Sequence, residues 1–481
     1  MRTTAHGPLD VETTTGSGER FAGIVERALS KFLALPLGIL AGFLIAGAAT
    51  YALDRANAAW IQPLRRVLQD YVFSDPQTTG DFLGAAAGGL FTQTSIVISM
   101  LLLVLQNTAA NMGNLVYDHF MERRRNQVYV GYVTGAVVLA YFVHSTVSET
   151  FNPVLGGTLV LLVTFLSVAL LAWFLYSTMN QMKPEVVVGD IHSTAMHARE
   201  KELRTLARTR RESISEADVL VVVRSTDHGY VTRLNLDTID DCLQSGDPAT
   251  EMVVHAAVGD FVSYRDILAE IRSRDIAEAQ QVAGCVGEAF TLAREREPDY
   301  DSRFNLLQLE VMGWTEASSS KQNPETALMV VHTLRDLLRR WALMDLAPAD
   351  VKEPVAVVYP DRVVERVVDA FESLAVASVE SMQHQVFAEV LEALALSYRD
   401  LPRGVQQRVD SMLWRVVPGL REHFYTVRLQ GALNRMVQTL RDAGDTDVAN
   451  MLAQARAELA RTAGRVPAAN GGSGGGGGTS S

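Results

Sequence analysis

The sequence predicts a membrane protein in two parts. A membrane α-helical domain of four transmembrane helices is followed by a cytoplasmic α+β domain, which has a small β-rich module and a mostly helical C-terminal part. Residues 32–182 contain four long apolar runs, residues 183–465 are charged and amphipathic, and residues 218–273 contain short runs typical of strands. Because a helix rises about 1.5 Å per residue, each apolar run can cross a hydrocarbon core about 30 Å thick.

The four predicted spans cover residues 32–53, 82 to about 110, about 128–147 and about 154–176. Pro36 lies in the first turn of the first span, where the missing N–H of proline costs little. Gly38 and Gly42 in the first span have the Gly-x-x-x-Gly spacing that lets membrane helices approach closely. Gly131 and Gly135 repeat this spacing in the third span. We therefore expect residues 32–182 to pack as a four-helix transmembrane domain.

The two ends are expected to lie outside the folded parts. Residues 1–31 are polar, have no signal-peptide core and are predicted to form a disordered cytoplasmic N-terminus. Residues 466–481 are rich in glycine and serine, resemble an engineered linker or tag, and are predicted to be flexible.

The part that follows the spans divides into a helical juxtamembrane linker at residues 183–217, the β-rich module at 218–273 and a helical domain at 274–465. Residues 219–223 read VLVVV, a β-branched run typical of a buried strand. A short helix is expected over residues 238–243, with Asp237 as its N-cap.

The charge distribution predicts the orientation in the membrane. Basic residues precede the first span, separate the second from the third and follow the fourth, whereas the loop after the third span has none. Because cytoplasmic loops are enriched in Lys and Arg, both termini are predicted to lie in the cytoplasm. The formal net charge of −12 argues against nucleic acid as a partner.

The only cysteines are Cys242 and Cys285, and their spacing is neither metal-binding nor CxxC. Two such thiols are typical of a reducing compartment and predict no disulfide framework.

Several sequence motifs occur in a recognisable order. They are VISMLLLVLQNTAANMG and DHFMERRRNQVYVG in the apolar part, then HGYVTRLNLDTIDDCL, VGDFVSYRDIL and PDYDSRFNLLQLEVMGWTEASSSKQNPETA. Over about residues 30–345 the chain resembles a bacterial family of predicted membrane proteins whose domain has no known function. The resemblance implies a four-span membrane domain with a cytoplasmic domain, and it implies no activity.

Polar residues recur at helical spacing in the second span. Thr92, Ser95, Ser99 and Gln106 share one stripe, with Leu102 and Leu103 between the last two, and Asn107 and Asn111 continue on an adjoining stripe. Since lipid offers these groups no partner, they must face protein or water. In one interpretation they bond to the backbone and tie helices together. In the other they line a pore around a shared axis, with the leucines as a constriction, which requires several subunits.

Arg123, Arg124 and Arg125 follow the second span. In one interpretation they determine the topology of the membrane domain. In the other they form an electrostatic vestibule or a binding site for lipid phosphate. No acidic residue, lysine or arginine lies deep in a span, which argues against a proton-coupled transporter.

Outside the glycine-rich tail the chain has no Gly-x-Ser-x-Gly, no phosphate-binding Gly-x-x-x-x-Gly-Lys-Ser/Thr loop and no His-Glu-x-x-His. We expect no enzymatic activity, catalytic residue, metal or cofactor. The leading hypothesis is an oligomeric inner-membrane channel or pore, lined by the second span and gated or assembled by the cytoplasmic domain. The alternative is a membrane-anchored scaffold or sensor whose cytoplasmic domain binds a partner or small ligand. The expected partners are the lipid bilayer, further copies of the chain and inorganic ions.

Overall fold

The computed structural model describes residues 33–463 except 57–59, 61, 113–123, 182, 214–218, 245–246, 248, 320–323, 347–353 and 423. The chain forms two compact units, which divide between Met182 and Lys183. We call the first the membrane unit and the second the downstream unit.

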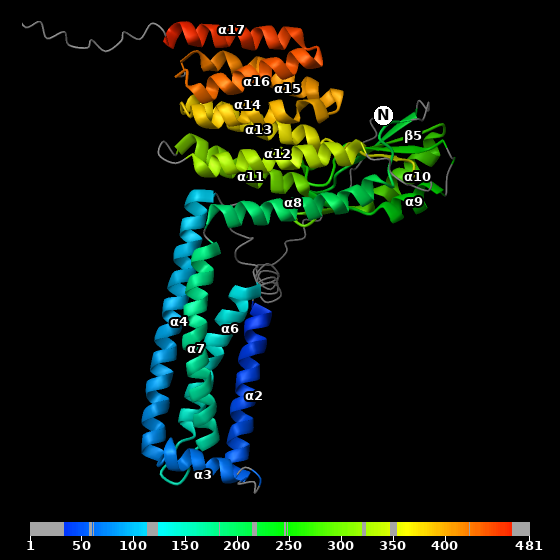
Figure 1. Cartoon of the computed structure of the whole chain (residues 1–481). Helices are drawn as coiled ribbons and strands as arrows, with labels where there is room; N and C mark the ends of the chain where they lie inside the picture. The colour runs from blue at the N-terminus through cyan, green and yellow to red at the C-terminus, as the bar shows by residue number, and fades with distance from the viewer. Residues whose placement is uncertain are drawn as a thin grey trace, which may run out of the picture. The chain divides into compact units, whose positions relative to one another are not determined.

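The membrane unit consists of the helices α2 (Ala34–Ala56), α3 (Gln62–Tyr71), α4 (Pro76–Met112), α6 (Arg124–Ser145) and α7 (Val154–Gln181) (Figure 1). Four of them are long and apolar enough to cross a membrane, through Ala34–Ala56, Pro76–Leu103, Asn126–Ser145 and Val154–Gln181. The four predicted apolar helices are therefore confirmed. The short helix α3 is amphipathic and follows α2.

Helix α6 packs against α2, α4 and α7 and lies at the centre of this unit. At Gly131 an added Cβ would lie 2.7 Å from the Cα of Pro36, so glycine is required where α6 crosses α2. An added Cβ at Gly135 would collide with the ring of Phe43. By contrast, Gly38 and Gly42 have nothing within 4 Å of the position a Cβ would take. Of these two spacings, the one in α6 therefore serves close packing among the described residues of the unit.

The downstream unit begins with α8 (Pro184–Leu206) and a module of two sheets. The four-stranded sheet has the order β1 (Val219–Arg224), β5 (Ile267–Ser273), β3 (Glu251–Val254), β7 (Val357–Val358). The three-stranded sheet has the order β4 (Phe261–Val262), β2 (Gly229–Leu234), β6 (Phe290–Ala293). All pairs are antiparallel except β3 with β7. Helix α10 (Ile276–Val286) and the short η3 (Gly287–Ala289) come before β6, and α11 (Ser302–Ser319) follows it. The sequence predicts helix over this whole region, so the prediction is wrong at β6.

A stack of helices completes the downstream unit (Figure 1). Its elements are α11 (Ser302–Ser319), α12 (Glu325–Leu346), α13 (Val363–Glu380), α14 (His384–Ser397), η4 (Tyr398–Asp400), α15 (Arg403–Val416), η5 (Val417–Glu422), α16 (Val427–Ala443) and α17 (Thr446–Ala463). Alternate helices contact one another: α11 contacts α13 and α13 contacts α15, while α12 contacts α14 and α14 contacts α16. Each helix therefore packs on its neighbours in two rows, as in helical repeat proteins.

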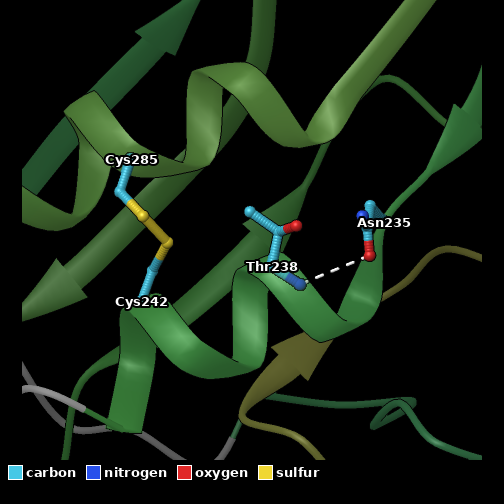
Figure 2. The surroundings of a disulfide bond; sticks show 4 residues. All are labelled: Asn235, Thr238, Cys242 and Cys285. Atoms are coloured by element: carbon cyan, nitrogen blue, oxygen red, sulfur yellow. Dashed lines mark hydrogen bonds between the residues drawn. A yellow bond between two sulfur atoms is a disulfide. The ribbon is translucent and has the colours of Figure 1, made fainter.

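Helix α9 (Leu236–Gln244) starts two residues earlier than the sequence predicts, and its cap differs. The side chain of Asn235 accepts hydrogen bonds from the backbone N–H groups of Asp237 and Thr238, at 3.1 and 3.3 Å. Figure 2 shows the bond from Thr238. Asp237 therefore does not cap the helix. It lies in the first turn and accepts a hydrogen bond from Arg208 at 2.7 Å.

The expectation of two unpaired thiols is wrong in this structure. Cys242 of α9 and Cys285 of α10 form a disulfide, with their Cα atoms 6.2 Å apart (Figure 2). The two cysteines are 43 residues apart in sequence, and the fold packs α9 against α10. Sequence spacing alone could not reveal this proximity, because it depends on how the two helices are placed over the sheets.

Candidate functional site

The polar residues predicted in the second span lie on the outer face of α4. The side chains of Thr92, Ser95, Ser99, Leu102, Leu103 and Gln106 are all exposed in the single chain. The hydroxyl of Thr92 donates to the carbonyl of Gly88 at 3.0 Å, and that of Ser95 to the carbonyl of Phe91 at 3.2 Å. Such bonds within a helix satisfy a hydroxyl that faces lipid.

The remaining predicted residues lie in or after the last turns of α4. Gln106 follows Val104 and Leu105, whose side chains lie outside the described structure. Asn107 and Asn111 belong to α4, and their side chains lie outside the described structure. Arg123 lies outside the described residues, while Arg124 and Arg125 begin α6 with undescribed side chains.

A buried polar cluster in the membrane unit was not predicted from the sequence. Gln93 of α4 donates to the backbone carbonyl of Ser167 at 2.9 Å and to the hydroxyl of Tyr129 at 3.2 Å. The hydroxyl of Ser167 donates back to the Gln93 side chain at 2.9 Å. Gln93 therefore ties α4 to α6 and α7. One interpretation of the sequence assigned this structural role to the stripe that contains Thr92, Ser95 and Ser99.

The downstream unit contains a pocket of about 250 Å³ with a largely charged lining, which we call the basic pocket. It is bounded by the C-terminal half of α8, by β2, by the loop before β4 and by the residues that lead into α11 and α13. Five basic residues, two acidic residues and two tyrosines line it: Arg199, Lys201, Arg233, Arg303, Arg362, Glu202, Asp361, Tyr300 and Tyr359. The apolar part of the wall includes Leu206, Leu234, Val258, Pro360 and Val363.

An ion pair between Arg199 and Asp361 forms one side of the basic pocket. The Arg199 guanidinium is fully buried and donates to both carboxylate oxygens of Asp361, at 2.9 and 2.7 Å. A two-pronged pair of this kind fixes the relative orientation of its partners. It therefore holds α8 against the segment that leads into α13.

Glu202 is largely buried on the same side of α8. Burial raises the pKa of its carboxyl, whereas hydrogen bonds from Ser302 and the charge of Arg199 lower it, and the net shift is upward. The backbone N–H and the hydroxyl of Ser302 donate to it at 2.8 and 2.6 Å. Because Ser302 is the first residue of α11, this contact anchors the start of that helix.

The opposite side of the pocket is formed by Arg303 and Tyr359. Arg303 donates to the carboxylate of Asp260 at 2.9 Å and to the carbonyl of Val258. The backbone N–H of Val258 donates to the hydroxyl oxygen of Tyr359 at 2.8 Å. Burial raises the pKa of the Tyr359 hydroxyl, which therefore stays protonated at neutral pH.

Two cations of the pocket have no carboxylate partner within the described part of the chain. The ammonium of Lys201 donates to the carbonyl of Asp299 at 3.1 Å and lies 4.2 Å from the ring centroid of Tyr300. Arg362 is exposed, and its guanidinium forms no ion pair with the described residues. In contrast, Arg233 is paired with Glu297 at 3.1 Å.

The pocket brings together segments that are far apart between residues 199 and 363. Part of its lining lies in motifs noted in the sequence, residues 232–234 in HGYVTRLNLDTIDDCL, Val258 in VGDFVSYRDIL, and Tyr300 and Arg303 in PDYDSRFNLL. The motifs alone do not show that these segments meet around one space. Among the described residues, no group of three or more His, Cys, Asp and Glu side chains is placed to hold a metal ion.

Comparison with protein families gives one result. A family model described as "Predicted membrane protein (DUF2254)" matches residues 29–395. Comparison with curated proteins and with solved structures finds no match.

Proposed function

We propose that this chain, which belongs to the family of predicted membrane proteins just described, is a membrane-anchored sensor. In this proposal its downstream unit binds a small ligand. Four helices of the membrane unit provide the anchor. The basic pocket is the observation that carries the proposal, because concave sites with an apolar wall and a few converging polar groups are where proteins usually bind small molecules.

A binding role suits the pocket better than catalysis. Its two carboxylates are already engaged, Asp361 by Arg199 and Glu202 by Ser302. Neither is placed as a free base beside a nucleophile, the arrangement on which acid–base or nucleophilic catalysis depends. We therefore propose that the pocket recognises a ligand without transforming it.

The test is thermal unfolding of the purified full chain in detergent with pools of small metabolites grouped as sugars, amino acids, carboxylates and phosphate esters. A ligand at 100 times its Kd should raise the Tm by roughly 5 °C. Leu234→Trp should abolish the shift by filling the pocket, whereas Leu343→Trp, at an exposed position on α12, should keep it. The sensor proposal is wrong if no pool raises the Tm, or if the shift persists in Leu234→Trp.

A second candidate function is the oligomeric channel lined by α4, and it has its own support. The exposed face of α4 carries Gly88 and Gly89, with nothing within 4 Å of either added Cβ, followed by Thr92, Ser95 and Ser99. Small residues of this kind allow helices of neighbouring subunits to approach closely. Copies arranged around an axis would turn this face, with Leu102 and Leu103 beyond it, toward a shared opening.

Cross-linking and conductance test the channel together. Ser99→Cys should form disulfide-linked oligomers in membranes, whereas Val97→Cys, which is buried inside the unit, should not. Inorganic ions should then pass through the purified protein in a planar bilayer, and Leu102→Ala should change the conductance. Monomeric Ser99→Cys together with a silent bilayer would remove this candidate.

We further propose that both termini lie in the cytoplasm of a bacterial plasma membrane. The support is the distribution of Lys and Arg around the spans. The Cys242–Cys285 disulfide counts against this placement, because disulfides are rare in cytosolic proteins. A reporter fused to the C-terminus distinguishes a cytoplasmic from a periplasmic end. A fluorescent protein that folds only in the cytoplasm should be bright, whereas an active fusion to a phosphatase that works only in the periplasm would contradict the proposed orientation.

A further inference from the structure

We propose that the basic pocket binds a small phosphate monoester. This inference rests on the proposed sensor function and names the chemistry of its ligand. The argument comes from the charges that line the pocket, from the two cations that are available to a ligand, and from the size and apolar wall of the space.

The lining charges favour a dianion. Three of the five lining cations are paired with carboxylates, Arg199 with Asp361, Arg233 with Glu297 and Arg303 with Asp260. The other two, Lys201 and Arg362, are left to face a ligand, and the remaining carboxylate of the wall, Glu202, accepts hydrogen bonds from Ser302. A phosphate monoester carries close to two negative charges at neutral pH and complements two cations better than a carboxylate does.

Two side chains are available to contact the phosphate. Lys201 on α8 and Arg362 at the start of α13 have no carboxylate partner within the described residues, and both line the same space. Arginine donates two parallel hydrogen bonds to phosphate oxygens, and lysine supplies a compact charge. Arg303 also lines the pocket, but it is paired with Asp260 and is therefore less available to the phosphate.

The remaining wall selects the organic part. Leu206, Leu234 and Pro360 provide an apolar surface beside the cations. The volume of about 250 Å³ is at the small end for ligand sites, which excludes dinucleotides and favours a phosphate on a short organic group. The same monoester chemistry occurs on soluble metabolites and on the headgroup of phosphatidic acid, so the experiment must separate these sources.

The experiment is isothermal titration of the full chain in detergent with glycerol 3-phosphate, inorganic phosphate, glycerol and acetate, and with mixed micelles that contain phosphatidic acid. Glycerol 3-phosphate should bind more tightly than acetate, and glycerol should not bind. Tighter binding of the micelles than of glycerol 3-phosphate identifies the lipid as the source, and the reverse identifies the soluble ester; either result supports the proposal.

Matched variants locate the site. Lys201→Ala and Arg362→Ala should each weaken binding about tenfold, as expected for loss of a charge-assisted hydrogen bond. Arg204→Ala is the control, because Arg204 is exposed on the same helix α8 and does not line the pocket. An unchanged Tm without ligand shows that each variant is folded, and Arg362→Lys should recover part of the affinity.

Two results would overturn the proposal. One is binding of glycerol 3-phosphate and of phosphatidic acid micelles no tighter than that of acetate. The other is binding that Lys201→Ala and Arg362→Ala leave unchanged. If a neutral metabolite raises the Tm in a manner that Leu234→Trp abolishes, the sensor function stands and only the phosphate chemistry fails. If no compound binds, both proposals fail.

Discussion

Arg199 is the residue on which the basic pocket most depends. Its guanidinium is fully buried, makes a two-pronged contact with Asp361 and lies 3.4 Å from the Glu202 carboxylate. Removal of Asp361 takes away the closer counter-charge of a buried cation, which is far more costly than the loss of a surface pair.

We predict that Asp361→Ala lowers the free energy of unfolding of the downstream unit by about 3–5 kcal/mol. Asp400→Ala is the control, because Asp400 pairs with Arg339 at 2.8 Å on the surface, where an ion pair contributes about 0–1 kcal/mol. Denaturant unfolding of the full chain in detergent measures both. Equal losses in the free energy of unfolding for the two variants would contradict a buried ion pair between Arg199 and Asp361.

At the level of residues, the sequence identifies chemistry more readily than position. Asn235 and Asp237 are both good helix caps, and only the structure shows that Asn235 accepts the N–H groups. Likewise Gln93 and Ser99 are both polar residues in an apolar helix. The exposed stripe could be predicted from its period, but the inward direction of Gln93 depends on where α6 and α7 pack.

At the level of elements, the disulfide joins α9 to α10 across the core of the β-rich module. Cys242 is buried in this core, whereas Cys285 is exposed on α10 and accessible to reductants. A cross-link between residues 43 apart restricts the unfolded chain and stabilises the fold by about 4 kcal/mol in the chain-entropy account.

We therefore predict that a thiol reductant lowers the Tm of the purified chain. The double variant Cys242→Ser/Cys285→Ser should have the lower Tm from the outset and should not respond to the reductant. Differential scanning calorimetry under both conditions makes the comparison. A wild-type Tm that the reductant does not change would restore the expectation of two reduced thiols.

The contact of η4 with α15 and with the loop before α17 should respond to pH. The Tyr398 hydroxyl lies 2.9 Å from the Asp410 carboxylate and 2.6 Å from that of Asp445, and one O–H can donate to only one of them. Burial raises the pKa of Asp410 to about 6, the Tyr398 hydrogen bond lowers it, and the charge of Asp445 raises it.

Because the pKa of Asp410 is higher in the folded state, its contribution to stability is complete below about pH 4 and is lost as the pH rises through about 6. Asp410→Asn cannot ionise, so we predict that it is more stable than the wild type at pH 8, by roughly 1 kcal/mol after allowance for partial exposure. The advantage should vanish at pH 4. Thermal unfolding at the two pH values tests this, and an equal difference at both would contradict it.

The sequence predicts the long helices and also the short strand β1, whereas it predicts helix where β6 lies. Apolar runs as long as Val154–Gln181 leave little alternative to a spanning helix. The four-residue β6 has no such signal, because its pairing with β2 arises from a contact between segments about 60 residues apart. Strand β7 joins the other sheet by pairing with β3, over a separation of about 100 residues.

At the level of the whole molecule, two units with different chemistry share one chain. The membrane unit has an exposed polar face on α4 and a buried polar cluster around Gln93, and the downstream unit brings five cations and two carboxylates together in the basic pocket. The division into an apolar and a charged half can be predicted from composition. The pocket cannot, because α8, β2 and the start of α13 meet only when the sheets and the helical stack are assembled.

The most direct test of the sensor proposal is amide hydrogen exchange of the full chain in detergent, with and without saturating glycerol 3-phosphate. We predict slower exchange in three segments around the pocket, residues 199–206, 232–234 and 359–363, and unchanged exchange in α14 and α16. Exchange that is unaltered in those three segments, or slowed only elsewhere in the chain, would contradict the assignment of this pocket as the binding site.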